Sequence, residues 1–218
     1  ARERYHERMQ RRVFDRAFAY WLGLVVTTLA SAGCGTAQRP GLAAGPPLRQ
    51  GDPEAPPSLS ALPELRKQDS ERLHGVLTYA RQVLEAKLPP PPQDRSYDAL
   101  TNWVEADVAR WVAARREGVD ETRFEFGRAG DGSGEAPLIT SAVLGMLHED
   151  TARALVELPS PRELDNEPEI AEMYRELVSA QSEPFIAAAR AEYRSCASAA
   201  KQAGGSARFA RFCQARFE

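Results

Sequence analysis

The sequence predicts an all-α protein built of antiparallel helical hairpins, which follows a disordered segment rich in proline and glycine. Two observations lead to this expectation. From residue 64 onwards, apolar residues recur mostly at intervals of three and four, the period of a helix that buries one face. Proline or glycine stands at most boundaries between these runs, where it ends one helix or precedes the next.

Composition and charge set the first limits. The chain has 218 residues, of which 43% are hydrophobic and 27% are charged, a globular composition. Residues 64–218 are predicted to be the helical domain, which is long enough to bury a core. The formal charge of −3 is uneven: residues 1–33 hold six arginines against three acids, so the remainder has 22 basic and 28 acidic residues, a net −6. An acidic body argues against a nucleic-acid partner.

Residues 1–33 resemble a signal peptide in their charge pattern. A basic flank at residues 11–16 precedes residues 17–32, a run of 16 residues without a charge. This run is short for a membrane span, which needs about 20 residues. Cleavage after Ala32 would release a soluble secreted protein, because Ala30-Ser31-Ala32 fits the ordinary cleavage pattern. The other two alternatives are an uncleaved anchor and a lipid-modified Cys34.

The run Ser31-Ala32-Gly33-Cys34 is similar to the lipobox of bacterial lipoproteins, although Ser31 stands where that family usually has an aliphatic residue. The resemblance implies that Cys34 carries a diacylglycerol and an acylated amine, and two or more acyl chains give stable anchoring. In that family an Asp after the cysteine retains the protein in the inner membrane, so Gly35 implies the outer membrane. The expected location is therefore the outer membrane, lipid-anchored through Cys34, with the domain facing the periplasm.

Residues 34–63 are predicted to be the lipid anchor and a flexible tether. Seven prolines and four glycines fall between Gly35 and Pro63, with few large apolar residues. Such a segment extends at about 3 Å per residue in its proline-rich parts and cannot form a core of its own.

The first half of the domain is predicted to contain two helices. One spans residues 64–88, after Pro63 and before the four prolines at 89–92. The next begins after Ser96, a helix-capping residue type, and is expected to end at Gly118. Residues 119–135 are the least regular part: residues 122–126 alternate in polarity and could form a short strand, and residues 127–134 are expected to be a flexible loop.

Three helices are predicted in the second half. The first begins at Ala136-Pro137 and ends before Pro159. The second spans residues 168–202, with a kink expected at Pro184. The third follows Ser206 as its cap and places Phe209, Cys213 and Phe217 on one face.

The cysteines predict one disulfide. Cys196 and Cys213 lie at equal distances from Gly204-Gly205, where two antiparallel helices would turn and bring them opposite each other. A bridge closing this loop would stabilise the fold by about 3 kcal/mol. The alternative is two buried free thiols. Pairing them leaves Cys34 free to carry the lipid.

The C-terminal third, from Leu147 onwards, is similar to segments of bacterial envelope proteins with tetratricopeptide-like helical repeats. The matching positions are Pro159, Pro161, Leu164, Tyr174, Leu177, Gln181, Pro184, Ala188, Tyr193, Cys196 and Cys213. No 34-residue repeat and no Trp-Leu-Gly-Tyr repeat signature is visible. The resemblance implies helical hairpins, in a repeat-like array or an irregular bundle, and a scaffold role with no catalytic motif.

No catalytic, metal or cofactor motif is complete in this chain. Residues 130–134, Gly-Asp-Gly-Ser-Gly, fit neither a nucleophile elbow nor a phosphate loop, and they lack the ligands of a calcium loop. His148-Glu149-Asp150 lacks the second histidine of a zinc helix, because Ala152 stands in its place. After removal of the predicted signal peptide, which contains His6, only His74 and His148 remain, too few for a His-rich metal site. We therefore expect neither metal nor cofactor.

Aromatic residues offer the one candidate groove. Trp103 and Trp111, with Tyr97 and Phe124, could line a binding surface for a peptide or a glycan. The alternative is that their spacing places them along one buried stripe of the core.

These observations favour a non-catalytic lipoprotein of the cell envelope, whose periplasmic helical domain binds an envelope protein or acts as a scaffold, with no small-molecule substrate. One alternative is an envelope enzyme that acts on cell-wall material. A deep pocket with two converging carboxylates, or a Ser/His pair, would favour the enzyme, whereas a shallow apolar groove would favour binding. A purely structural spacer would have a rigid, elongated shape and no groove.

Overall fold

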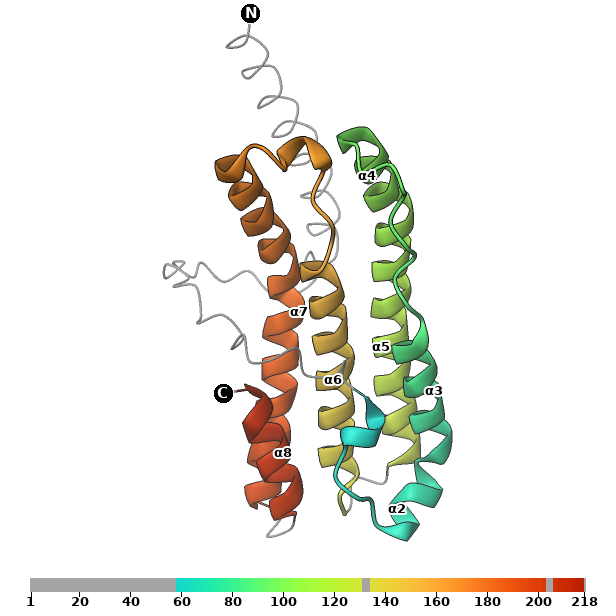
Figure 1. The fold of residues 1–218 in the computed structure, drawn as a ribbon. Coiled ribbons are helices and arrows are strands. Elements are labelled where there is room, and N and C mark those ends of the chain that lie inside the picture. The colour runs from blue at the N-terminus through green and yellow to red at the C-terminus, as the bar shows by residue number, and fades with distance from the viewer. Residues whose placement is uncertain (1–57, 131–133, 203–205, 218) are drawn as a thin grey trace, which may run out of the picture. The chain divides into compact units, whose positions relative to one another are not determined.

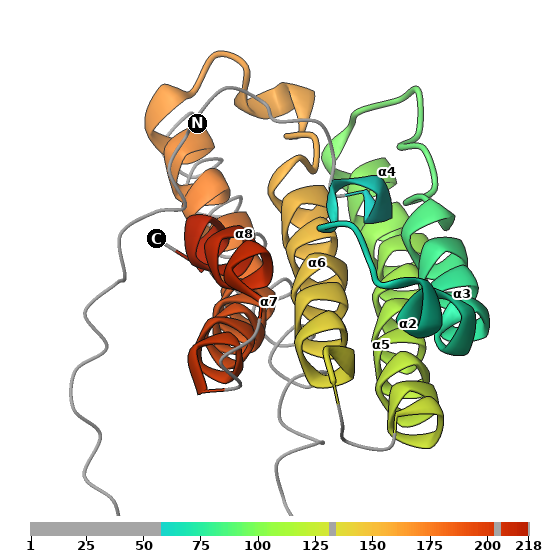
Figure 2. The same ribbon diagram turned by 90° about the horizontal axis from the view of Figure 1, so that it is seen from below.

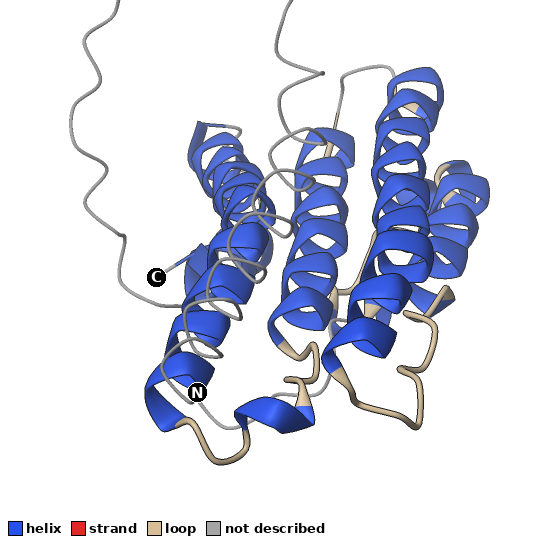
Figure 3. Ribbon diagram, turned by 90° about the horizontal axis from the view of Figure 1, so that it is seen from above, coloured by secondary structure: helices blue, strands red, loops and turns tan. Residues whose placement is uncertain are grey.

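In the computed structural model, the described residues are 58–130, 134–202 and 206–217, and all belong to one unit, Asp52–Glu218. Every regular element in these ranges is a helix, which confirms the all-α class (Figures 1 and 3). Among the described residues, no helix is both long and apolar enough to cross a membrane. The predicted signal peptide, Cys34 and nearly all of the predicted tether lie outside the described residues.

Successive long helical segments run antiparallel to one another (Figure 1). The α-helices are α2 (Lys67–Arg72), α3 (His74–Glu85), α4 (Tyr97–Trp103), α5 (Ala109–Ala129), α6 (Ala136–Val156), α7 (Pro168–Gln202) and α8 (Ala207–Phe217). Short 3-10 helices, η1 (Leu59–Ala61) and η3 (Arg162–Leu164), and one π-helix, η2 (Val104–Val108), complete the order.

Helix α6 is the centre of the arrangement. It lies between α5 and α3 on one side and α7 and α8 on the other (Figure 2). Because it packs on both sides, its buried residues are spread around the helix rather than along one stripe. Gly145 lets α7 approach closely, since a Cβ there would stand 2.7 Å from the ring of Tyr193. The main hydrophobic core surrounds α6 and includes residues of α3, α5, α7 and α8.

Helices α4, η2 and α5 form one continuous helical stretch, and here two expectations were wrong. Gly118 does not end the helix, which continues to Ala129. Instead, its missing side chain makes room for Val83 of α3, whose nearest carbon would stand 2.9 Å from a Cβ at this position. The expected strand at 122–126 is also helical: Thr122 and Phe126, four residues apart, point inward, while Phe124 between them is 60% exposed.

The beginning of the domain also differs from the expectation. The helix expected at 64–88 is divided into α2 and α3, with Leu73 between them, and it ends at Glu85. Leu73 is fully buried in the main core. Leu59 and Leu62, which lie in the segment predicted to be a tether, also pack against that core.

The bounds predicted for the second half agree closely with the structure. Helix α6 begins at Ala136 and ends at Val156, and α7 spans Pro168–Gln202 as predicted, with Pro184 inside it. Helix α8 follows Ser206, whose carbonyl oxygen accepts a hydrogen bond from the Ala210 amide.

Helix α7 is longer than the helix it packs against. Gly145 lies against Tyr193, so Val156, eleven residues further along α6, falls opposite Ser182, eleven residues earlier in α7. The first 14 residues of α7, 168–181, therefore extend past the end of α6, as Figure 1 shows. None of them is buried, whereas Ser182 is fully buried. We call residues 168–181 the overhang.

Candidate functional site

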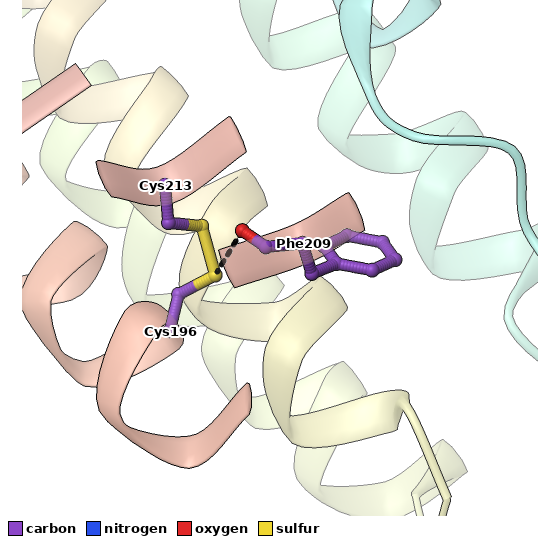
Figure 4. The surroundings of a disulfide bond; sticks show 3 residues. All are labelled: Cys196, Phe209 and Cys213. Carbon is purple, nitrogen blue, oxygen red and sulfur yellow. Dashed lines mark hydrogen bonds between the residues drawn. A yellow bond between two sulfur atoms is a disulfide. The ribbon is translucent and has the colours of Figure 1, made fainter. Parts of the chain in front are cut away.

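The structure joins Cys196 of α7 to Cys213 of α8 in a disulfide (Figure 4). Both residues are completely buried in the main core. The Cys196 sulfur also lies 3.8 Å from the carbonyl oxygen of Phe209, another fully buried residue of α8. The bridge therefore fastens the C-terminal helix to the bundle. The predicted turn at Gly204-Gly205 lies outside the described residues.

The two tryptophans proposed for a groove are buried in different places. Trp103 is 6% exposed and belongs to a second hydrophobic cluster with Leu100, Leu155 and Phe185. Trp111 is 7% exposed, and its indole nitrogen donates a hydrogen bond of 2.8 Å to the carbonyl oxygen of Ala86, at the end of α3. The π-helical turn lies between the two tryptophans. They share neither a groove nor a single core stripe.

A small cleft of about 210 Å³ opens between α3 and α5, beside Trp111. Its walls include Tyr79 and Gln82 of α3, and Arg115 and Gly118 of α5. This volume is below the usual range for small-molecule sites, which begins at about 300 Å³. The cleft is therefore a weak candidate for a substrate pocket.

A buried ion pair that no sequence motif indicates lies behind this cleft. Arg115 of α5 donates a hydrogen bond of 2.7 Å to a carboxylate oxygen of Asp150 in α6, and the two side chains are only 3% and 10% exposed. Burial lowers the pKa of Arg115 and raises the pKa of Asp150, while the attraction between them opposes both shifts. The Arg115 guanidinium also lies 4.8 Å from the centre of the Trp111 ring. The pair links α5 to α6, and its two members already satisfy each other's charge.

The histidine-acid run on α6 has a structural role. One carboxylate oxygen of Glu149 accepts hydrogen bonds from the Tyr193 hydroxyl at 2.6 Å and from Arg216 at 2.8 Å, so it connects α6 with α7 and α8. His148 lies beside the ring of Phe185, with ring centres 6.5 Å apart. Burial lowers the pKa of His148. Within the described ranges, no group of three or more His, Cys, Asp or Glu side chains is placed to hold a metal ion.

The overhang is the part of α7 that lies beyond the end of α6. Its contacts come mainly from the segment between α6 and α7: the Tyr174 hydroxyl donates a hydrogen bond of 3.1 Å to the carbonyl oxygen of Pro159. That segment is in turn held to the start of α4, where the Tyr97 amide bonds to the Glu163 carboxylate and the Arg95 carbonyl accepts from the Arg162 amide. Met173 of the overhang is 42% exposed, one of the few large apolar side chains so exposed in the described part of the chain.

Acidic residues surround the overhang. Residues 157–183 contain eight acids and two arginines, so this segment has a net charge of −6. The eight acids are Glu157, Glu163, Asp165, Glu167, Glu169, Glu172, Glu176 and Glu183. Unequal helix lengths, 21 residues for α6 and 35 for α7, were the sequence signal that could have revealed this surface. Comparison with known proteins adds no constraint, because no family model, no curated protein and no solved structure matches this chain.

Proposed function

We propose that this chain is a lipid-anchored protein of the bacterial cell envelope whose helical domain binds another protein through the overhang, without covalent chemistry. The observation that carries the binding role is that 14 consecutive residues of α7 extend past α6, and each of them is exposed or only half-buried. Helices in water are marginal at this length unless one face is packed, so such a segment is suited to completion by a partner helix.

The lipobox-like Ser31-Ala32-Gly33-Cys34 supports the proposed anchor, and the sequence of residues 34–63 supports a tether that lets the domain reach its partner. The disulfide between Cys196 and Cys213 supports an oxidising compartment such as the periplasm. A partner anchored in the same envelope would meet the domain at a raised effective concentration.

Crosslinking in living cells tests the binding role. A photoreactive amino acid replaces Met173 on the overhang, and in a control it replaces Glu121, an exposed residue of α5. The expected result is a discrete adduct of the chain with one envelope protein from position 173 and none from position 121. Equal adducts from both positions, or none from position 173, would remove the overhang as a binding surface.

The anchor has its own test. Cells that express the full chain are labelled with radioactive palmitate, and incorporation is expected to disappear in Cys34→Ala. Label that persists in this variant would refute lipidation at Cys34.

A further inference from the structure

The overhang carries two parallel stripes of different chemistry. Ile170, Met173 and Leu177 are spaced by three and four residues, so they lie along one line of the helix. An acidic residue directly precedes each of them in the sequence: Glu169, Glu172 and Glu176. These three acids share the same spacing and form a second stripe beside the apolar one.

Both stripes are accessible. Met173 is 42% exposed, Ile170 and Leu177 are partly exposed, and the three glutamates are exposed. On the other side of the apolar stripe, Tyr174 faces the chain that joins α6 to α7, through its hydrogen bond to Pro159. The open side of the apolar stripe is therefore the side with the acids.

The acids have little to neutralise them. Glu172 pairs with Arg175, one turn further along the same helix, and that arginine is itself 65% exposed. Among the described residues, neither Glu169 nor Glu176 forms an ion pair. Two carboxylates without an ion-pair partner, and a third paired with an exposed arginine of the same helix, therefore give this edge of the apolar stripe a net negative charge.

This negative charge determines which kind of partner can bind the apolar stripe. A second copy of the chain would place its own acidic rim and its own segment of net charge −6 nearby, and such like-charge contacts disfavour association. An anionic membrane surface is repelled for the same reason. A helix with basic residues beside an apolar seam satisfies both stripes together, since charged positions that flank a helix–helix seam set the choice of partner.

Building on the proposed function, we propose that the partner of the overhang is a basic amphipathic helix of another protein. Its apolar seam packs on Ile170, Met173 and Leu177, and its Lys or Arg side chains face Glu169, Glu172 and Glu176. The overhang is about 21 Å long at 1.5 Å per residue, so it accommodates about four turns of the partner.

A pair of designed peptides tests the chemistry of the partner. Both are fluorescent helices of about four turns with leucine along the seam, one with lysine and the other with glutamate at the flanking positions. Anisotropy titrations with the purified full chain should give binding about tenfold or more tighter for the lysine peptide, and this preference should fade as salt is raised. Equal affinity for the two peptides would overturn the proposal.

Variants locate the binding. Replacement of Glu169, Glu172 and Glu176 by Gln should weaken the lysine peptide about tenfold, if each exposed pair contributes a factor of about two. The matched control changes the same charge elsewhere, by Glu→Gln at the exposed positions 105, 117 and 121 of η2 and α5, and should leave the affinity unchanged. Equal weakening by both triple variants would mean that the peptide senses only net charge, and it would overturn the assignment to the overhang.

Two further outcomes separate this inference from the proposed function. If position 173 forms its specific crosslink in cells but the lysine peptide shows no preference, the overhang is a binding surface and the basic partner is wrong. If sedimentation of the full chain shows dimers that Met173→Glu dissociates, the occupant is a second copy and the basic partner is again wrong. If position 173 forms no crosslink in cells, the proposed function itself is refuted.

Discussion

Replacement of Gly145 by alanine should destabilise the fold, although alanine is the better helix former. In an exposed helix, Gly→Ala gains up to about 1 kcal/mol from helix propensity. At Gly145 the new methyl group would stand 2.7 Å from one ring carbon of Tyr193 and 2.9 Å from two others. Ordinary contacts between carbon atoms are about 3.5–4.0 Å, so α6 or the ring must move by more than half an ångström.

The ring of Tyr193 cannot yield easily. Its hydroxyl donates a hydrogen bond of 2.6 Å to Glu149, and its ring makes a T-shaped contact with the ring of Phe212, with ring centres 6.4 Å apart. Overpacking of this kind costs about 1–3 kcal/mol. After subtraction of a propensity gain of about 1 kcal/mol, we expect Gly145→Ala to lower the free energy of unfolding by up to about 2 kcal/mol.

Urea denaturation followed by circular dichroism measures this effect. The matched control is Gly127→Ala in α5, where a Cβ would have no neighbour within 4 Å. The control should stabilise the protein by about 0.5–1 kcal/mol, so the two substitutions are expected to shift the midpoint in opposite directions. If Gly145→Ala stabilised the protein as much as the control, the close approach of α6 and α7 at this point would be refuted.

Three further predictions follow from the buried polar groups and the disulfide. Arg115→Met leaves the Asp150 carboxylate without its partner and should lower the free energy of unfolding, measured in urea, by about 3–5 kcal/mol. The double variant with Asp150→Leu should recover most of this loss. If it recovered none, the two side chains would not act as a buried charge pair. Replacement of both Cys196 and Cys213 by serine should lower the free energy of unfolding by about 3 kcal/mol, and reduction of the disulfide in the natural protein should lower it by the same amount. A loss below about 1 kcal/mol would show that the bridge contributes little to the stability of the fold. The pKa of His148 is lower in the folded state than its unfolded value of 6.5, because burial disfavours the charged imidazole. The neutral side chain therefore costs no stability above pH 6.5, and the free energy of unfolding falls as the pH drops from 6.5 towards the folded pKa. His148→Leu should flatten this slope between about pH 7 and pH 5.5, and an unchanged slope would assign it to another group.

Local sequence signals were sufficient where one residue type decides the outcome. Pro168 begins α7 and Pro137 stands in the first turn of α6, as the restricted backbone of proline favours. The cysteine pairing could be predicted because Cys196 and Cys213 lie at equal sequence distances from Gly204-Gly205, as facing residues of two antiparallel helices do.

Errors arose where tertiary packing overrode a local signal. Gly118 looks like a helix end in the sequence, but the approach of Val83 explains why a glycine stands inside α5. Residues 122–126 alternate in polarity, yet Thr122 and Phe126 obey the four-residue spacing that buries a helix face. The ion pair of Arg115 and Asp150 joins residues 35 apart, and no local pattern reports such a contact.

The position of Pro184 gives α7 two different local stabilities. Proline has no amide hydrogen, so the carbonyl oxygen of Ala180 lacks its helical bond at the point where α7 leaves α6. The residues before this break can unfold without exposing core side chains, whereas Tyr193 and Cys196 can be exposed only by opening the core itself. Amide hydrogens of one continuous helix thus exchange with solvent by two routes, local fraying before Ser182 and global unfolding beyond it. A partner that binds the residues before Ser182 must also order them, and this ordering reduces the net binding free energy. The complex is therefore readily reversible.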